Sequence, residues 1–139
     1  MGGTLKWITA KSKKLLRIIR KIWSNPGESC DERKHIETIE AEMKKLNFDE
    51  VTIDPQGNVI GYMGSGDKIL AFDAHIDTVG IGNIENWNFD PYEGYETEEE
   101  IGGRGVSDQC GGLVSAVYGA RIMKDMDLIP EGYKIMVVG

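Results

Sequence analysis

Apolar positions recur along this chain with two different periods, and these periods predict helices that alternate with strands. Between residues 29 and 46 the apolar side chains lie three or four positions apart, which is typical of an amphipathic helix, and residues 113–126 repeat this spacing. Shorter apolar runs, bounded by residues that favour turns, predict strands at 51–53, 58–63, 68–75 and 133–138. The last run is nearly continuous, which favours the middle of a sheet covered on both faces. Together the elements predict an α/β fold with a mixed β-sheet flanked by helices.

Local signals predict where the first of these helices begins and ends. Ser29 and Glu32 have the spacing of a capping box, in which a serine hydroxyl and a glutamate carboxylate bond the free N–H groups at a helix start. Asn47 fits the left-handed position that often follows a helix. His35 has charged neighbours in the sequence, so it is interpreted as a surface residue rather than a ligand.

Residues 78–101 predict an irregular loop followed by an edge strand. Trp87, Phe89 and Tyr92 could anchor the loop on the core. The acidic residues 93–101 favour an edge strand with a solvated hairpin tip at 98–100. Consecutive side chains in a strand alternate faces, so the glutamates at this tip cannot converge on one ion.

Charge is distributed unevenly between the start of the chain and its body. The first 23 residues hold seven of the sixteen Lys and Arg and none of the 23 Asp and Glu. Residues 4–23 combine these bases with helically spaced apolar residues, so they predict a basic amphipathic helix. Such a helix can lie on an anionic membrane, but a first domain helix with a solvated basic face is favoured. The acidic body, in a chain of net charge −7, argues against nucleic acid as a partner.

Length and composition limit the class of protein. The 139 residues suffice for one domain with a core, and 40% hydrophobic and 28% charged residues are usual in soluble globular proteins. No apolar run approaches the roughly 20 residues that a membrane span needs, and no signal peptide is recognised. Cys30 and Cys110 are too few for a disulfide framework. These features predict a cytoplasmic protein.

A polar pair follows the third predicted strand directly. Residues 69–72 are apolar and typical of a buried strand, and His75 and Asp77 come next. Side chains two positions apart in an extended chain share a face, so Asp77 can accept one ring N–H of His75 and leave the other nitrogen to a metal ion. A strand end with a hydrogen-bonded structural histidine fits the same residues, because a lone H-x-D is a weak signal.

A second acid, Asp108, lies in the glycine-dense stretch 101–112. Glycine allows backbone conformations with positive φ, so Asp108 can lie on a sharp loop before the helix near residue 113 and face a cleft. A flexible surface loop is the alternative interpretation.

The two stretches together resemble the metallopeptidase family M20, which contains aminoacylases, deacetylating and desuccinylating amidohydrolases and carboxypeptidases. The signatures of that family are a strand ending in His-x-Asp and a glycine-rich loop around an aspartate. They read here as AHIDTV at 74–79 and GRGVSDQCGG at 103–112, and NWNFDPYEG at 86–94 resembles the segment between them. The likeness is greatest to a subgroup of hydrolases linked to selenium metabolism. Cys110 departs from the family, because many members carry lysine there, which concerns the electrostatics of the loop rather than metal binding.

The resemblance implies a zinc-exopeptidase-like catalytic domain that binds two zinc ions, with Co²⁺ or Mn²⁺ as substitutes. It implies that His75 is a ligand of one metal, that Asp108 bridges both, and that Asp77 is the active-site acid that orients His75. The substrate implied is a small amide, either an N-acyl amino acid or a peptide. Paired metals lower the pKa of a shared water and polarise the scissile carbonyl.

The same resemblance implies that residues 1–139 are the N-terminal part of such a domain. One histidine and one bridging acid give each zinc at most two protein ligands, against the usual three or four. The family supplies the other ligands, a general base in a Glu-Glu pair and a lid domain further along its sequence. We therefore expect this chain alone to be inactive. The alternatives are a non-catalytic domain that acts by association and a different metal-assisted hydrolase, and the sequence specifies neither the substrate nor the oligomeric state.

Overall fold

The computed structural model of the protein describes residues 27–97 and 100–139, and the helix predicted over 4–23 lies outside these ranges. The described elements are, in chain order, α2 (Arg33–Lys45), β1 (Glu50–Ile53), β2 (Val59–Gly64), β3 (Lys68–Asp73), the 3-10 turn η1 (Ile84–Asn86), β4 (Tyr95–Glu96), β5 (Ile101–Gly102), the irregular turn η2 (Val106–Cys110), α3 (Gly111–Asp125) and β6 (Tyr133–Val138).

Four strands form one mixed sheet in the order β1-β2-β6-β3. Strands β1 and β2 pair antiparallel, with Val51 opposite Gly61, and β2 pairs antiparallel with β6. Strand β6 pairs parallel with β3, with Val137 opposite Phe72. A parallel pair needs a crossover connection, and α3 lies in the connection from β3 to β6. The predicted α/β class with a mixed sheet is confirmed, and β6 has the interior position predicted for it.

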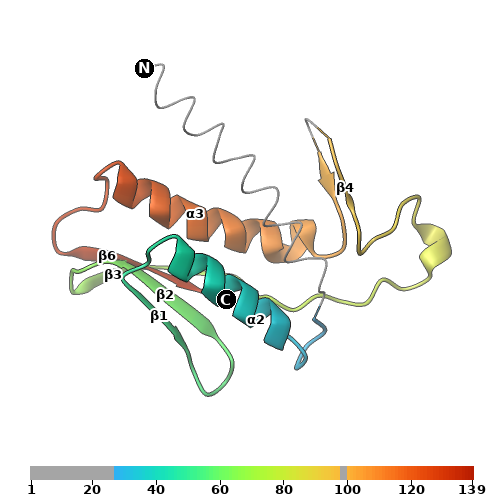
Figure 1. Ribbon diagram of the computed structural model, residues 1–139, viewed down its shortest axis with the longest axis horizontal. Helices are drawn as coiled ribbons and strands as arrows, with labels where there is room; N and C mark the ends of the chain where they lie inside the picture. The colour runs from blue at the N-terminus through green and yellow to red at the C-terminus, as the bar shows by residue number, and fades with distance from the viewer. Residues whose placement is uncertain (1–26, 98–99) are drawn as a thin grey trace.

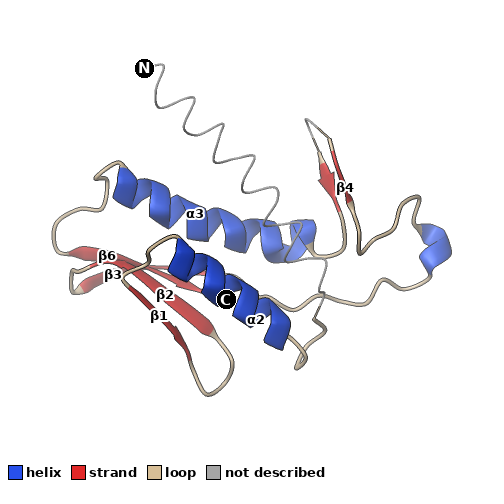
Figure 2. Ribbon diagram, viewed as in Figure 1, coloured by secondary structure: helices blue, strands red, loops and turns tan. Residues whose placement is uncertain are grey.

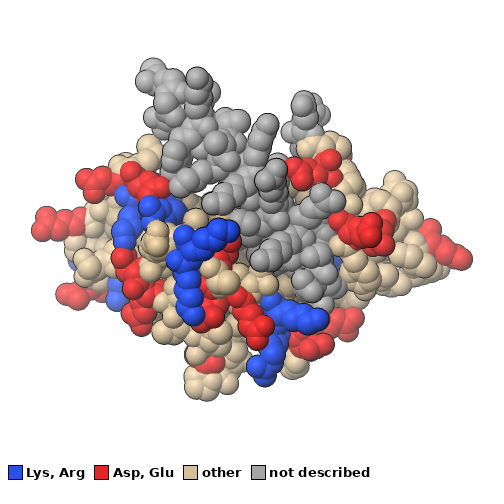
Figure 3. Space-filling view, in the orientation of Figure 1, with Lys and Arg blue, Asp and Glu red and all other residues tan. Residues whose placement is uncertain are grey.

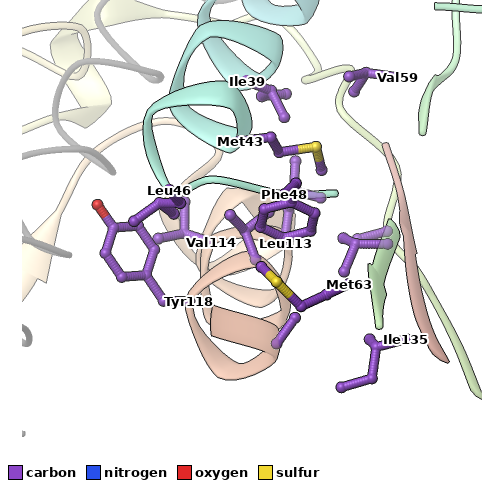
Figure 4. Packing of buried hydrophobic residues seen from close by; sticks show 14 of the residues in the cluster. Ile39, Met43, Leu46, Phe48, Val59, Met63, Leu113, Val114, Tyr118 and Ile135 are labelled. Carbon is purple, nitrogen blue, oxygen red and sulfur yellow. The ribbon is translucent and has the colours of Figure 1, made fainter. Parts of the chain in front are cut away.

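Both long helices, α2 and α3, lie on the same face of the sheet (Figures 1 and 2). The core fills the space between these helices and the strands β2 and β6 (Figure 4). Its buried side chains recur every three or four residues in the helices and every second residue in the strands, and they include Ile39, Met43, Val59, Met63, Leu113, Val114, Val117, Tyr118, Ile135 and Val137. Burial alternates along β6, which corrects the expectation of equal cover on both faces of this strand.

Helix α2 begins later than predicted. Its first residue is Arg33, and no side chain caps its free N–H groups. The Glu32 carboxylate accepts the backbone N–H of Cys30 at 2.8 Å instead, and the Ser29 hydroxyl turns toward another segment, so the capping-box prediction is wrong. The predicted end is confirmed, because Asn47 follows the helix with a left-handed φ of 54°.

His35 is buried, with 1% of its surface exposed, which contradicts the predicted surface position. It lies four and eight residues before Ile39 and Met43, the other buried positions of α2. Helical periodicity therefore turns His35 toward the core although its neighbours in the sequence are charged. Within the described ranges it belongs to no group of three side chains that could hold a metal ion.

Strand β3 is exposed at every position, although its sequence predicts a buried strand. Ile69 is 50% exposed and Leu70 is 48% exposed. Strand β3 is at the edge of the sheet, beside β6, while the helices pack over β1, β2 and β6. The prediction of burial is therefore wrong for the described part of the chain, because the edge position leaves both faces of β3 open.

Residues 79–97 and 100–104 extend away from the sheet as a loop and a hairpin (Figure 1). The predicted edge strand is instead a separate two-stranded sheet of β4 and β5. Phe89 packs edge-on against Trp87 and Tyr95, at 5.5 and 4.8 Å between ring centroids, so these three rings anchor the loop on one another rather than on the core. Tyr92, also predicted as an anchor, is 39% exposed.

The surface of this loop and hairpin carries mostly acidic charges (Figure 3). Arg104 is an exception, and its guanidinium lies 4.9 Å from the centroid of the Trp87 ring. Among the helices of residues 27–97 and 100–139, none has the length and apolar character needed to cross a membrane.

Candidate metal centre

The predicted site residues lie where the parallel strands β3 and β6 end. Strand β3 ends at Asp73, two residues before His75, and it is an edge strand. Ala74 continues its pairing by donating its N–H to the carbonyl of Val138 at 3.1 Å. Asp108 lies in η2 with an extended backbone, φ −127° and ψ 94°, directly before α3. Segments that follow the carboxyl ends of parallel strands commonly form the sites of α/β proteins.

His75 lies between two carboxylates. Its Nε2 is 2.8 Å from Oδ1 of Asp108, which is 33 positions away in the sequence. Its Nδ1 is 2.9 Å from Oδ1 of Asp77 and 3.1 Å from the backbone carbonyl oxygen of the same residue. Asp77 in turn accepts the hydroxyl of Ser29, with 2.5 Å between Oγ and Oδ2. The structure thus brings the three predicted residues into one hydrogen-bonded row, which Ser29 extends.

The carboxylates change the protonation equilibrium of the imidazole. The hydrogen bond to Asp108 is the largest influence and raises the pKa of His75 above its ordinary value. Burial opposes this rise, and the bonds to Asp77 add to it. The hydroxyl of Ser29, followed by the ring of His75, holds the pKa of Asp77 below its usual value. These bonds stabilise the protonated ring, which has one N–H for each carboxylate.

The donor set fits part of a metal site. Asp77 accepts the N–H of Nδ1, so Nε2 is the nitrogen available to a metal, and it faces the carboxylate of Asp108. Imidazole nitrogen and carboxylate oxygen are both usual zinc ligands. In residues 27–97 and 100–139, no group of three or more His, Cys, Asp or Glu side chains could hold a metal ion. The described chain therefore offers two ligands, with Asp77 behind the ring.

The candidate site is open to solvent. The side chain of His75 is 45% exposed and that of Asp108 is 87% exposed. A pocket of about 470 Å³ adjoins His75, and its lining includes Asp77 and Gln109 together with polar and apolar residues. An open position distinguishes catalytic metal sites from structural ones, whose ligands enclose the ion.

A buried threonine joins the segments that carry the site. Thr78 is 5% exposed and donates its backbone N–H to the carbonyl of Gly27 at 2.9 Å. Its methyl group occupies the space where Gly105 has no side chain, because a Cβ on Gly105 would lie 2.5 Å from Cγ2 of Thr78. Gly105 also has φ of +78°, which favours glycine. Thr78 therefore fixes the turn before Asp108 against the segment that carries His75.

The sequence pattern did not identify Ser29 and Thr78 as parts of the site. The spacing of Ser29 to Glu32 indicated a helix cap, and no local pattern predicts a contact with Asp77, 48 positions away. The sequence did contain an indication for Thr78, because this residue directly follows Asp77 in the H-x-D-T stretch.

Cys110 is in the core rather than on the loop surface. It is 1% exposed, and burial raises the pKa of its thiol to about 11. Its backbone N–H donates to the carbonyl of Gly105 at 2.9 Å. A neutral thiol at this position therefore packs beneath the turn that presents Asp108.

The sequence is similar to a known protein family and to proteins of two bacteria. Residues 71–139, which include all three predicted site residues, match the model of peptidase family M20/M25/M40. YgeY of Escherichia coli (strain K12), described as uncharacterized, is 56% identical over 125 residues, which cover 90% of this chain and 31% of that protein. A Staphylococcus aureus (strain MRSA252) protein named "Probable succinyl-diaminopimelate desuccinylase" is 33% identical over 94 residues, 68% of this chain and 22% of that protein. The chain thus spans a third or less of the length of these relatives.

Solved structures share the fold at low sequence identity. Human carnosine dipeptidase 1 superimposes with a TM-score of 0.78 at 14% identity, over 96% of this chain and 32% of that one. The YXEP protein of Bacillus subtilis, described as a dinuclear metal binding peptidase from the M20 family, has a TM-score of 0.67 at 18% identity, over 94% of this chain and 35% of that one. These likenesses concern the fold alone. The family match and the curated relatives show that this chain belongs to peptidase family M20/M25/M40.

Proposed function

We propose that this chain supplies the first ligands of a divalent metal site in an M20-type hydrolase that cleaves an amide bond, in an N-acyl amino acid or a peptide-like substrate. The observation that carries the proposal is the 2.8 Å approach of His75 Nε2 to the Asp108 carboxylate, with Asp77 on the other ring nitrogen. Relatives named as a desuccinylase and a dipeptidase agree with this reaction class.

Each residue of the row has a separate task in the proposed site. His75 binds through Nε2, Asp108 binds through its carboxylate, and Asp77 keeps the proton on Nδ1. Zinc is the ion proposed, with Co²⁺ or Mn²⁺ as alternatives, and a second ion can share Asp108 because a carboxylate has two oxygens. A bound divalent metal supplies a water of lowered pKa and polarises the scissile carbonyl.

The described residues do not complete this chemistry. His75 and Asp108 are two ligands, whereas zinc usually has three or four. Hydrolysis also needs a base within reach of the attacking water, and the carboxylate of Asp77 is turned toward His75 and Ser29. We propose that residues 1–139 alone do not hydrolyse amides, and that further segments of a longer protein supply the base, the other ligands and a lid.

Metal binding by the whole chain tests the ligand assignment. Isothermal titration with Zn²⁺ should show weak binding, and Asp108→Asn and His75→Ala should each remove most of it. Asp127→Asn is the matched control, because Asp127 is exposed beyond the opposite end of α3. Zinc binding that survives His75→Ala would refute the assignment.

Activity tests the proposed incompleteness. We expect no release of free amine from a panel of N-acyl amino acids and dipeptides, with or without added Zn²⁺. Turnover that Asp108→Ala abolishes would show that an acid of this chain serves as the base.

Association is a second candidate function, and the exposed strand β3 is the observation that favours it. Ile69, Leu70 and Phe72 are each at least 40% exposed along this edge, and an exposed apolar edge strand can pair with another chain. Sedimentation velocity over a range of concentrations separates the candidates, because a strictly monomeric chain would remove the support for self-association.

A further inference from the structure

The hydrogen-bonded row at the site begins at a serine that the M20 signatures do not include. Ser29 precedes α2 and lies 48 positions before Asp77, to whose Oδ2 it donates its hydroxyl at 2.5 Å. The other oxygen, Oδ1, is 2.9 Å from Nδ1 of His75. An ionised carboxylate only accepts hydrogen bonds, so each oxygen of Asp77 has its own donor.

This double contact restricts the Asp77 carboxylate. Rotation about its Cβ–Cγ bond would break the bond to Ser29 or the bond to His75. Oδ1 therefore stays opposite Nδ1. Together with the backbone carbonyl of Asp77, 3.1 Å from the same nitrogen, it keeps the ring proton there and leaves Nε2 directed at Asp108. We propose that Ser29 is a positioning residue that orients His75 as a metal ligand by fixing the carboxylate of Asp77. This inference rests on the proposed function in one respect, which is that a metal ion binds Nε2 of His75.

The turn that carries Ser29 is held at both ends. The carbonyl of Gly27 accepts the backbone N–H of Thr78 at 2.9 Å. The carboxylate of Glu32 accepts the N–H of Cys30 at 2.8 Å. A Cβ on Gly27 would lie 2.8 Å from the carbonyl oxygen of Asp31, so the turn is also tightly folded. The turn thus presents the hydroxyl of Ser29 to Asp77 through contacts that do not depend on the hydroxyl itself.

A purely structural tie between two loops is the competing explanation for this contact. Loss of a tie would lower stability and leave the ring of His75 unchanged. Loss of a positioning residue would change which ring nitrogen carries the proton, and it would weaken metal binding. The state of the His75 ring therefore distinguishes the two roles.

The first measurement is the tautomer of His75 in the whole ¹⁵N-labelled chain. Two-bond ¹H–¹⁵N correlation spectra, recorded at a pH where the ring is neutral, should show the proton on Nδ1, with His75→Ala identifying the signals. Ser29→Ala should give a mixture with the Nε2–H tautomer. Ser29→Thr keeps a hydroxyl and should restore the Nδ1–H form.

The second measurement is zinc affinity by titration of the same variants. Partners behind a metal ligand typically contribute about 10-fold or more in affinity, so Ser29→Ala should weaken zinc binding about 10-fold. Ser65→Ala is the matched control, because Ser65 is exposed in the turn before β3, at the opposite end of the sheet from His75, and its affinity should not change.

The outcomes separate this inference from the proposed function. If the unmodified chain binds no zinc but Ser29→Ala still mixes the tautomers, the metal site is refuted while the orienting role of Ser29 stands. If Ser29→Ala leaves the tautomer of His75 unchanged, the positioning role is overturned, even if the variant is less stable.

Discussion

Strands β2 and β3 have the same length and similar numbers of apolar residues, yet they lie in opposite environments. Strand β2 alternates between buried and partly exposed positions, and Val59 and Met63 have no exposed surface. Strand β3 is exposed at all six positions. The two strands flank the same neighbour, β6.

The helices that pack over β2 but not over β3 explain why the two strands differ in exposure. Helices α2 and α3 both pack over β2, whereas β3 lies beyond β6 at the edge of the sheet. An apolar run therefore indicates a strand whose side chains favour burial. Whether a helix of the described chain packs over that strand depends on the position of the strand in the sheet. The candidate metal centre follows β3, the more exposed of the two strands. Substitutions in β3 should therefore lower stability less than substitutions in the core.

The largest expected difference is between two Leu→Ala substitutions. Leu113 in α3 is 1% exposed, so Leu113→Ala should lower the free energy of unfolding by about 2–5 kcal/mol. Leu70 in β3 is 48% exposed, so Leu70→Ala should cost about 1 kcal/mol or less. Urea denaturation measures both, and equal losses would mean that β3 is covered in solution.

A hydrogen bond between the two covering helices should have an intermediate effect. The hydroxyl of Tyr118 in α3 donates to Oε1 of Glu42 in α2 at 2.7 Å. Tyr118→Phe removes one partner of this charged bond and should cost about 1–3 kcal/mol in the same denaturation experiment. A loss below the error of the measurement would show that the bond does not hold the helices together.

The same pair predicts a pH dependence. Burial, together with the bond to Glu42, raises the pKa of Tyr118 above its ordinary value of 10.0. The folded protein then holds this proton more tightly than the unfolded chain. The resulting stability is fully present below pH 10 and is lost as the pH rises above it. Unfolding experiments from pH 8 upward should show a steeper decline for the unmodified chain than for Tyr118→Phe.

The smallest expected change is a gain from Gly119→Ala in α3. Nothing lies within 4 Å of the position that its Cβ would take. Alanine has a higher helix propensity than glycine, so stability should rise by about 0.5–1 kcal/mol. Gly61→Ala in β2 is the control and should lower stability, because its Cβ would lie 2.6 Å from Sδ of Met43 beneath α2.

Local periodicity predicted the elements whose own residues determine them. Strand β6 has the predicted bounds, and α3 begins two residues before the predicted 113. Asn47 has the predicted left-handed conformation. The close approach of His75 and Asp108 depends on a long-range contact, and it was expected because the family resemblance relates the two motifs.

The failures concern positions that distant segments determine. Ser29 has the local spacing of a helix cap, but an ionised carboxylate from residue 77 is a stronger acceptor for its hydroxyl. His35 is buried because four-residue spacing places it with Ile39, although adjacent charges suggested the surface. The exposure of β3 depends on its edge position, which no local pattern encodes.

The contact between Thr78 and Gly105 has a consequence for variation in length. These two residues bracket the loop and hairpin of 79–104, and their close approach brings the ends of that segment together. Insertions and deletions near η1, or between β4 and β5, would therefore change the length of the segment 79–104 without changing the distance between His75 and Asp108. The cost of closing a longer loop grows only slowly with its length. Proteins related to this one can therefore differ in the length of this segment while the candidate metal centre keeps its geometry.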